Sequence, residues 1–161
     1  MKDSARGATD VQSGPSSPAG QGESGEVCLA DGLPAGWEWS DFKTVCRKIT
    51  DGTHHSPAKD DQKLEGEFKY ITAKNVKEAG IIFKNLTYLS EEIHRPIYER
   101  CNPEKGDVLY IKDGVTTGVA TVNQLDEEFS MLSSVALLKP FHEAISAEFI
   151  KWYLNLSLIH I

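Results

Sequence analysis

The pattern of apolar and polar residues changes abruptly at Leu33. Residues 1–32 consist mostly of Gly, Ser, Ala and acidic side chains, with Val11, Val27 and Leu29 as the branched aliphatic residues. So few apolar groups cannot bury enough surface to offset the entropy lost on ordering. We therefore expect a disordered leader over 1–32 and one domain over 33–157.

Alternation of apolar and polar residues predicts strands in the first half of this domain. Trp37 and Trp39 alternate with polar residues and are expected to be core anchors, and 42–49 reads as a short amphipathic element. Segment 66–76 (GEFKYITAKNV) predicts a strand that ends at 74–75, and segment 80–90 predicts a second.

Two stretches have helical signals. Ser90, followed by two glutamates, is typical of an N-cap, but Pro96 is expected to limit this helix to one or two turns. Ser146 precedes a C-terminal helix, one face of which carries Phe149, Ile150, Tyr153 and Leu154. The chain ends while this helix is still running, so we expect a fragment of a longer protein, with 158–161 a frayed or non-native end.

The second half of the domain contains the clearest hairpin. Strands are predicted at 108–111 and 119–122, joined by a loop over 112–118 whose glycines favour positive φ. Segment 129–140 (FSMLSSVALLKP) is almost uninterrupted small and apolar sequence, which favours one strand covered on both faces. The predicted fold class is α+β: a twisted, largely antiparallel sheet with short helices and a C-terminal helix.

Composition and charge narrow the classes of function. A formal net charge of −7 over 161 residues argues against nonspecific coating of nucleic acid. Between Lys43 and Lys84, however, nine basic and six acidic side chains give +3, so we expect this half to face any anionic partner. No apolar run suits a membrane span or secretory signal, which predicts a cytoplasmic protein without membrane contact. Cys28, Cys46 and Cys101 form no Cys-x-x-Cys pair and are expected to be reduced, the last two filling core space.

The stretch ITDGTHHSP, residues 49–57, invites a catalytic or metal-binding interpretation. His54 and His55 are adjacent, so an extended chain points them apart, and no other histidine has the spacing of a zinc ligand. Asp-Gly-Thr resembles the motif of aspartate-nucleophile phosphatases, but Ile49 occupies the place of the nucleophile. A polar turn, with Asp51-Gly52 in left-handed geometry, is the structural alternative.

Other motifs offer no convincing catalytic constellation. Gly118 is followed by Val119 and Ala120, where a P-loop requires Lys and a hydroxyl. What remains is a set of short polar loops on an apolar scaffold, TDGTHHS, AKNVKEAG and KDGVTTG. Their Asn, Lys and Thr side chains suit contacts with base edges, although many solvated loops share this composition.

The order of these segments resembles the target recognition domain of type I restriction-modification specificity subunits. The resemblance runs from Leu33 to about Leu156. It is carried by LPAGWEWSDFKTVCRKITDGTHHSP, YITAKNVKEAGI, the stretch from Tyr88 through the hairpin to Val122, and FSMLSSVALLKP.

This resemblance implies a non-enzymatic domain that reads one half of a bipartite site in double-stranded DNA. The implied partners are methyltransferase (modification) subunits and restriction subunits. No cofactor is expected in this chain, whereas S-adenosylmethionine, Mg²⁺ and ATP are expected on the partner subunits. We expect neither the spacer helix nor the second recognition domain of the family within these residues, and we therefore expect one domain to bind DNA weakly.

The family pattern maps onto three parts of this sequence, 50–54, 74–75 and 106–118. Lys74 and Lys112 are expected to hold phosphates, whereas Asn75, Thr53 and the two histidines are better suited to base edges. A structural role for the TDGTH turn remains equally open. The full predicted set of DNA-binding residues is Thr50, Asp51, Thr53, His54, His55, Lys74, Asn75, Lys112, Thr116 and Thr117.

Three alternatives stay open. The domain could belong to a fused restriction enzyme with methyltransferase activity in the same chain. A small metal-dependent enzyme would use the His54/His55 loop and purify with stoichiometric metal. An interaction protein would bind another protein and no duplex.

Overall fold

The computed structural model describes residues 33–34, 36–58 and 61–159, the last three by their backbone alone. The predicted leader, 1–32, lies outside the described residues, as do 160–161 of the predicted frayed end. The chain divides into two compact units, Met1–Trp39 and Ser40–Ile161.

In the first unit, the described residues form a turn. The Trp37 N–H donates to the Pro34 carbonyl at 3.1 Å, and Gly36 has a φ of 85°. Trp37 and Trp39 are 56% and 76% exposed, so the prediction that they anchor the core is wrong. No strand forms here, and the alternation therefore has no sheet face on which to bury them.

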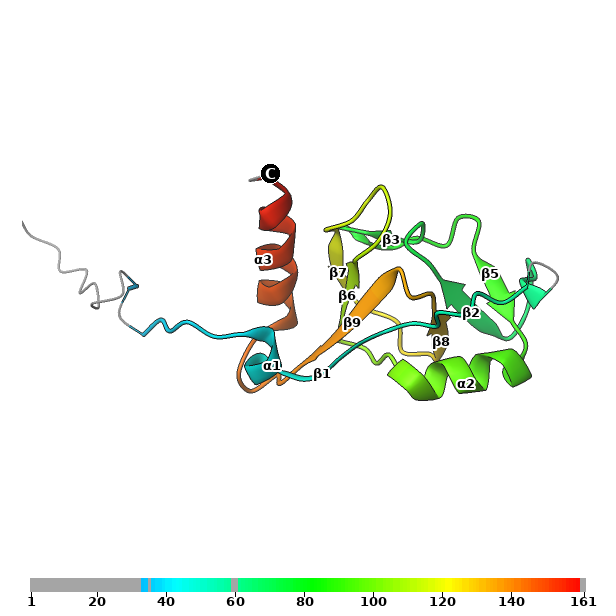
Figure 1. Cartoon of the computed structure of the whole chain (residues 1–161), viewed down its shortest axis with the longest axis horizontal. Coiled ribbons are helices and arrows are strands. Elements are labelled where there is room, and N and C mark those ends of the chain that lie inside the picture. Colours follow the sequence, from blue (N-terminus) through cyan, green and yellow to red (C-terminus); the bar gives the residue numbers. More distant parts are fainter. Residues whose placement is uncertain (1–32, 35, 59–60, 160–161) are drawn as a thin grey trace, which may run out of the picture. The chain divides into compact units, whose positions relative to one another are not determined.

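The second unit is built on a four-stranded antiparallel sheet (Figure 1). Its strands, in spatial order, are β1 (Cys46–Asp51), β9 (Val135–Pro140), β6 (Val108–Ile111) and β7 (Ala120–Val122). The predicted hairpin is confirmed as β6 and β7. Gly114 and Gly118 in its loop have φ values of 110° and 104°, which a glycine adopts without strain.

A three-stranded sheet packs against the first. Its strands are β5 (Thr87–Leu89), β2 (Phe68–Ile71) and β8 (Phe129–Met131). β2 and β8 run parallel, whereas every other pair of named strands in the described residues is antiparallel. A short hairpin of β3 (Val76–Lys77) and β4 (Gly80–Ile81) completes the strands. The predicted α+β class, with a largely antiparallel sheet, is confirmed.

Segment 129–140 is two strands in different sheets, so the prediction of one strand is wrong. The chain reverses after β8, where the Val135 N–H donates to the Leu132 carbonyl at 2.9 Å. Both strands contribute fully buried side chains to the core between the sheets, Met131 from β8 and Leu137 from β9. The sequence is continuously apolar because two strands share one core.

Helices cover the outer face of the four-stranded sheet. Residues predicted as one amphipathic element divide into α1 (Phe42–Val45) and the start of β1, and α3 (Ala147–Ile159) packs beside β7. Ser146 caps α3 as predicted, since its Oγ accepts from the Phe149 N–H at 3.2 Å. No helix in the described part of the chain has the length and apolarity that crossing a bilayer requires.

The buried face of α3 differs from the predicted one. Ile150 is 1% exposed and joins the core, but Phe149 and Tyr153 are 48% and 57% exposed. The buried Asn155 amide fixes this orientation, because it accepts from the Ala120 N–H at 2.8 Å and donates to the Ala120 carbonyl at 3.0 Å. The helix thereby satisfies the backbone of β7, an edge strand.

The helix α2 (Glu91–Cys101) runs through Pro96, so the prediction of a one- or two-turn helix is wrong. Pro96 is exposed on the solvent side, and the helical hydrogen bond that it cannot donate would have gone to the carbonyl of exposed Glu92. Water can satisfy that carbonyl.

Cys101 ends α2 as a buried free thiol and Cys46 is another, which confirms the prediction that both fill core space.

His94 fastens α2 to the three-stranded sheet. Its side chain is fully buried and stacks on Phe68, with ring centroids 3.8 Å apart. Nδ1 lies 2.9 Å from the Ser130 hydroxyl, and Nε2 lies 3.4 Å from the Glu128 carboxylate. Burial lowers the pKa of His94 from its ordinary value of 6.5, although the hydrogen bond to Glu128 opposes this shift.

We expect the protein to lose stability as the pH falls below 6.5. The folded pKa of His94 lies below the unfolded value, so the unfolded chain binds the proton first and stability is fully present only above 6.5. The free energy of unfolding should fall by at most about 2 kcal/mol between pH 6.5 and 5.

Urea unfolding at pH 5.0 to 7.5 measures this effect. His94→Gln is the control, because it removes the titrating group. The variant should be less stable at pH 7.5, but its free energy of unfolding should depend less on pH over this range. The carboxyl of Asp51 does not contribute in this window, since its pKa lies near 2. Equal slopes for wild type and variant would contradict the assignment.

Gly52 lies where the chain crosses from one sheet to the other. Its N–H donates to the Val135 carbonyl at 3.3 Å, and the Thr53 N–H donates to the Met131 carbonyl at 2.8 Å. A Cβ on Gly52 would stand 2.1 Å from the Met131 oxygen. Its φ is not among the positive values, so the prediction of left-handed geometry at Asp51-Gly52 is wrong. Glycine is required by the close backbone contact.

Gly52→Ala should therefore destabilise the fold by at least about 3 kcal/mol, because backbone must move to relieve the overlap. Gly114→Ala is the matched comparison: the left-handed φ is strained but no atom lies within 4 Å of the added Cβ, so about 1 kcal/mol is expected. Urea unfolding of both variants measures the difference. A Gly52→Ala cost no larger than that of Gly114→Ala would contradict the steric argument.

Candidate nucleic-acid interface

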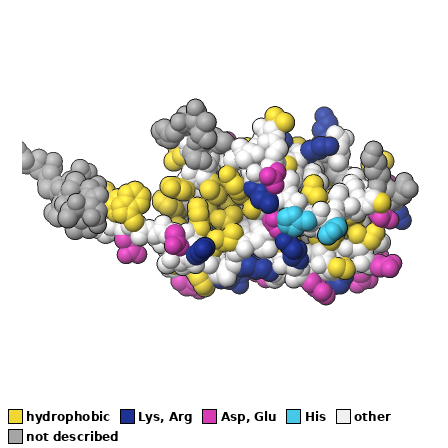
Figure 2. All heavy atoms as spheres, viewed as in Figure 1, with side chains coloured by type: hydrophobic (Ala, Val, Ile, Leu, Met, Phe, Trp, Pro, Cys, Tyr) yellow, Lys and Arg dark blue, Asp and Glu magenta, His cyan; other side chains and the backbone are white. Residues whose placement is uncertain are grey.

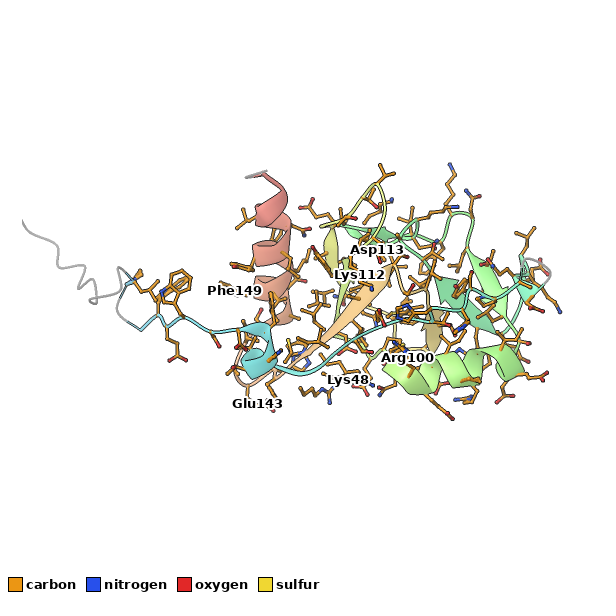
Figure 3. The ribbon with its side chains drawn as sticks, in the orientation of Figure 1. Lys48, Arg100, Lys112, Asp113, Glu143 and Phe149 are labelled. Carbon is orange, nitrogen blue, oxygen red and sulfur yellow. The ribbon has the colours of Figure 1, made fainter. Side chains whose placement is uncertain are left out.

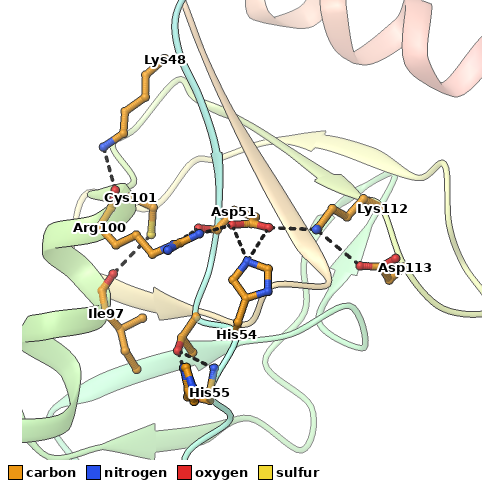
Figure 4. Close-up of polar contacts among 10 residues, drawn as sticks. Lys48, Asp51, His54, His55, Ile97, Arg100, Cys101, Lys112 and Asp113 are labelled. Atoms are coloured by element: carbon orange, nitrogen blue, oxygen red, sulfur yellow. Dashed lines mark hydrogen bonds and ion pairs between the residues drawn. The ribbon is translucent and has the colours of Figure 1, made fainter.

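The Asp51 carboxylate stands at the centre of a group of cationic side chains (Figure 4). It accepts from Arg100 Nη2 at 2.8 Å and pairs with Lys112 Nζ at 2.9 Å. His54 Nε2 lies 3.0 Å from one of its oxygens and 3.2 Å from the other. β1, α2 and the loop after β6 thus meet at one carboxylate. We call Asp51, His54, Arg100 and Lys112 the Asp51 cluster.

The electrostatics of the cluster favour the charged forms of Asp51 and Lys112. Burial works against ionisation of Asp51, but hydrogen bonds from Lys112 and Arg100 outweigh it and lower the pKa from 3.8 to about 2. The hydrogen bond to Asp51 in turn raises the pKa of Lys112. At neutral pH the cluster therefore holds one carboxylate against a guanidinium and an ammonium.

The cations remain accessible although they share one acceptor. The Arg100, Lys112 and His54 side chains are 48%, 34% and 53% exposed, against 17% for Asp51. Arg100 donates from Nε to the backbone carbonyl of Asp51 and from Nη2 to its carboxylate, which leaves further guanidinium N–H groups of its five for another acceptor. Figure 2 shows His side chains on one face of the molecule, with Lys and Arg side chains beside them.

Lys48 holds the C-terminal end of α2 beside this cluster. Its Nζ donates to the Arg100 carbonyl at 2.9 Å and to the Asn102 side chain at 3.2 Å. Figure 3 shows Lys48 and Arg100 near the end of α2, and Lys112 on the opposite side of β1. Lys48, Arg100 and Lys112 against Asp51 and Asp113 leave one net positive charge while the histidines are neutral.

The TDGTH turn combines structural and exposed residues. The Thr53 hydroxyl donates to the His55 carbonyl at 3.0 Å and accepts from the His55 N–H at 3.1 Å, so it closes the turn. His54 and His55 are exposed. Thr50 is half-buried and points to the opposite side of β1 from Asp51, because side chains alternate along a strand. Of the residues predicted here, the two histidines are the ones placed to meet a partner.

Lys74 and Asn75 divide in the same way. Lys74 is exposed, as a phosphate contact requires. Asn75 is 3% exposed, and its amide accepts from the Thr72 N–H at 3.1 Å and donates to the Ile82 carbonyl at 3.2 Å. The structure thus contradicts the expected base contact from Asn75: its hydrogen bonds close the turn between β2 and β3.

The hairpin loop presents Thr116 and Thr117 on the surface. The Thr117 hydroxyl donates to the Gly114 carbonyl at 2.6 Å and thereby stabilises the loop. Thr116 is exposed, and its carbonyl accepts from the Val119 N–H at 3.3 Å. Lys112, at the first position of the loop, belongs to the Asp51 cluster, so the loop begins at the cluster.

Sequence reasoning missed Arg100 and Lys48. Arg100 lies at the end of a helix that Pro96 was expected to interrupt, and it comes from the half of the domain with negative net charge. Its pairing with Asp51, 49 residues away, has no local signal. A longer helix would have placed a basic residue in its last turn, where the helix dipole favours one.

Among the described residues, no three His, Cys, Asp or Glu side chains are arranged to hold a metal ion. Comparison with models of known protein families finds no match, and comparison with curated proteins finds none either.

Asp51→Asn should lower the free energy of unfolding at pH 7 by on the order of 1 to 2 kcal/mol, since it removes the charge that Arg100 and Lys112 share. Because the folded pKa is depressed, this stabilisation is present above pH 3.8 and is lost as the pH falls towards 2. Urea unfolding at pH 7 and pH 3 should show the two proteins converging.

Asp113→Asn is the control, because Asp113 is 66% exposed and its carboxylate lies 3.6 Å from Lys112. We expect almost no change in stability from it. An Asp113→Asn effect as large as that of Asp51→Asn would refute a special role for Asp51.

Proposed function

We propose that this domain binds double-stranded DNA in a sequence-dependent manner, as a recognition domain that directs methyltransferase and restriction subunits to one half of a bipartite site. The observation that carries the proposal is the Asp51 cluster, in which exposed Arg100 and His54 and partly exposed Lys112 are fixed around one carboxylate. The resemblance to type I specificity subunits supplies the biological setting. A cytoplasmic location is part of the same proposal.

The chemistry of the cluster suits a phosphate. Arg and Lys are the usual phosphate ligands in DNA complexes, and Arg presents its N–H groups in a planar fork. His54 donates through Nε2 to Asp51, so Nδ1 faces away as an acceptor in the neutral ring and as a donor in the imidazolium. Arg100 and Lys112 would therefore hold the backbone, and the imidazoles would lie nearest to base edges.

Two loops add further groups, Thr116 for base edges and Lys74 for phosphates. Thr116 lies on the hairpin loop that begins at Lys112, and Lys74 is exposed on the turn after β2. In this division, phosphate contacts fix the register of the protein on the duplex and loop side chains select the sequence. Recognition by a fused restriction-methyltransferase would use the same surface, and the experiment below applies equally to it.

Replacing Arg100 or Lys112 with Gln should weaken duplex binding about five- to tenfold for every sequence, because each substitution removes one phosphate contact. The slope of log affinity against log salt should fall by about 1 for each. Fluorescence anisotropy with a labelled duplex pool, at several salt concentrations, measures both effects on the full chain.

Arg95→Gln is the matched control. It makes the same substitution on the same helix at similar exposure, 41% for Arg95 and 48% for Arg100, but Arg95 pairs with Glu91 and Glu128. Little change is expected from it. Equal weakening by Arg95→Gln and Arg100→Gln would mean that binding depends on overall charge and not on the Asp51 cluster. Absence of duplex binding at low salt would overturn the proposed function.

A further inference from the structure

The tip of the hairpin loop carries an apolar side chain in full contact with water. Val115 is 106% exposed, the highest value among the large apolar residues of the described chain. Its neighbours Asp113, Gly114, Thr116 and Thr117 are exposed as well. Single exposed apolar residues are common on surfaces, so the question is whether the loop is built to present this one.

The loop has a defined shape. The Thr117 hydroxyl and N–H both donate to the Gly114 carbonyl, at 2.6 and 3.2 Å. The Gly118 N–H donates to the Ile111 carbonyl at 2.8 Å. These bonds close the loop below Val115, so the side chain is displayed by an internally bonded turn.

The loop is also anchored to the candidate phosphate site. Lys112 pairs with Asp51 at 2.9 Å, and its N–H donates to the Ser134 carbonyl at 3.0 Å. Figure 1 shows the loop extending past the ends of β6 and β7. If Arg100 and Lys112 hold the DNA backbone, the position of Val115 relative to that backbone is set by the protein.

A valine side chain has no hydrogen-bonding group, so it can distinguish bases by apolar contact alone. The apolar group that DNA offers at a base edge is the C5-methyl group of thymine, which lies in the major groove. We propose that Val115 is a specificity-determining residue that packs on a thymine methyl group; this inference rests on the proposed function.

The composition of the loop favours the major groove over the minor groove. The major groove is wide enough for a two-stranded β-ribbon, and a hairpin tip has that form. Proteins that enter the minor groove use Arg, Lys, Asn or Gln together with large wedges such as Phe or Leu. The residues beyond Lys112 include the acidic Asp113 and no basic group, which suits poorly the strong negative potential of a narrow minor groove.

The test compares thymine with uracil, which lacks the methyl group and pairs identically. The preferred sequence is first selected by the full wild-type chain from a randomised duplex pool. Each thymine of that sequence is then replaced by uracil in turn, and affinity is measured for wild type and Val115→Ala. We expect one position at which uracil weakens wild-type binding about fourfold, as for one methyl group removed from an apolar contact.

At that position the penalty should vanish in Val115→Ala and persist in Leu64→Ala. Leu64 is a matched control, because it is 80% exposed but precedes β2, far along the chain from the hairpin. Both variants should unfold at the wild-type temperature, since neither side chain is buried.

The experiment distinguishes failure of the role of Val115 from failure of DNA binding. A wild-type protein that selects a sequence but shows the same uracil penalties as Val115→Ala, or none, would overturn the role of Val115 and leave the proposed function standing. A wild-type protein that selects no sequence would overturn the proposed function itself, and the role of Val115 with it.

Discussion

The backbone contact between Gly52 and Met131 determines how the two sheets of this domain meet. A side chain at position 52 would overlap the Met131 carbonyl, so the crossing from β1 to the three-stranded sheet depends on this glycine. Asp51 on one side of it ends the edge strand of the larger sheet, and Thr53 on the other side bonds to the turn between β8 and β9. The position of the Asp51 carboxylate, and with it the cationic cluster, follows from this close approach.

Buried polar groups fix the remaining elements in place. Asn155 binds the edge of β7, His94 attaches α2 to β8, and Asn75 closes the turn before β3. Lys139, 3% exposed on β9, pairs with the buried Asp107 at 2.8 Å and so fixes the start of β6. Each group loses its hydrogen bonds to water on burial, and only one arrangement of the chain replaces them. These contacts therefore specify position more than they add stability. The Asp51 cluster lies on a scaffold whose strands and helices are held by such pairs.

Features that depend on residues close together in the sequence could be predicted, and features that depend on residues far apart could not. The β6–β7 hairpin, the cap at Ser146 and the α+β class depend on neighbouring residues, and alternation, turn glycines and capping are visible locally. The burial of the Asn75 amide, the division of 129–140 between two sheets and the pairing of Arg100 with Asp51 depend on residues that the fold brings together. Gly52 illustrates the limit: Asp51-Gly52 was visible as a turn signal, but the left-handed geometry predicted from it is wrong, and the close contact with Met131 that requires a glycine has no local signal.

The charge of the cluster has a consequence for recognition under the proposed function. Within the Asp51 cluster, the carboxylate offsets one of the two charges of Arg100 and Lys112, in a chain of net charge −7. Nonspecific affinity for DNA rises with the number of phosphates neutralised. The small net charge of the cluster therefore gives only weak attraction to random sequence. Discrimination depends on the ratio between specific and nonspecific binding. A rigid cluster of low net charge, next to loops that carry His55, Thr116 and Val115, would therefore place most of the binding free energy in contacts that differ between sequences.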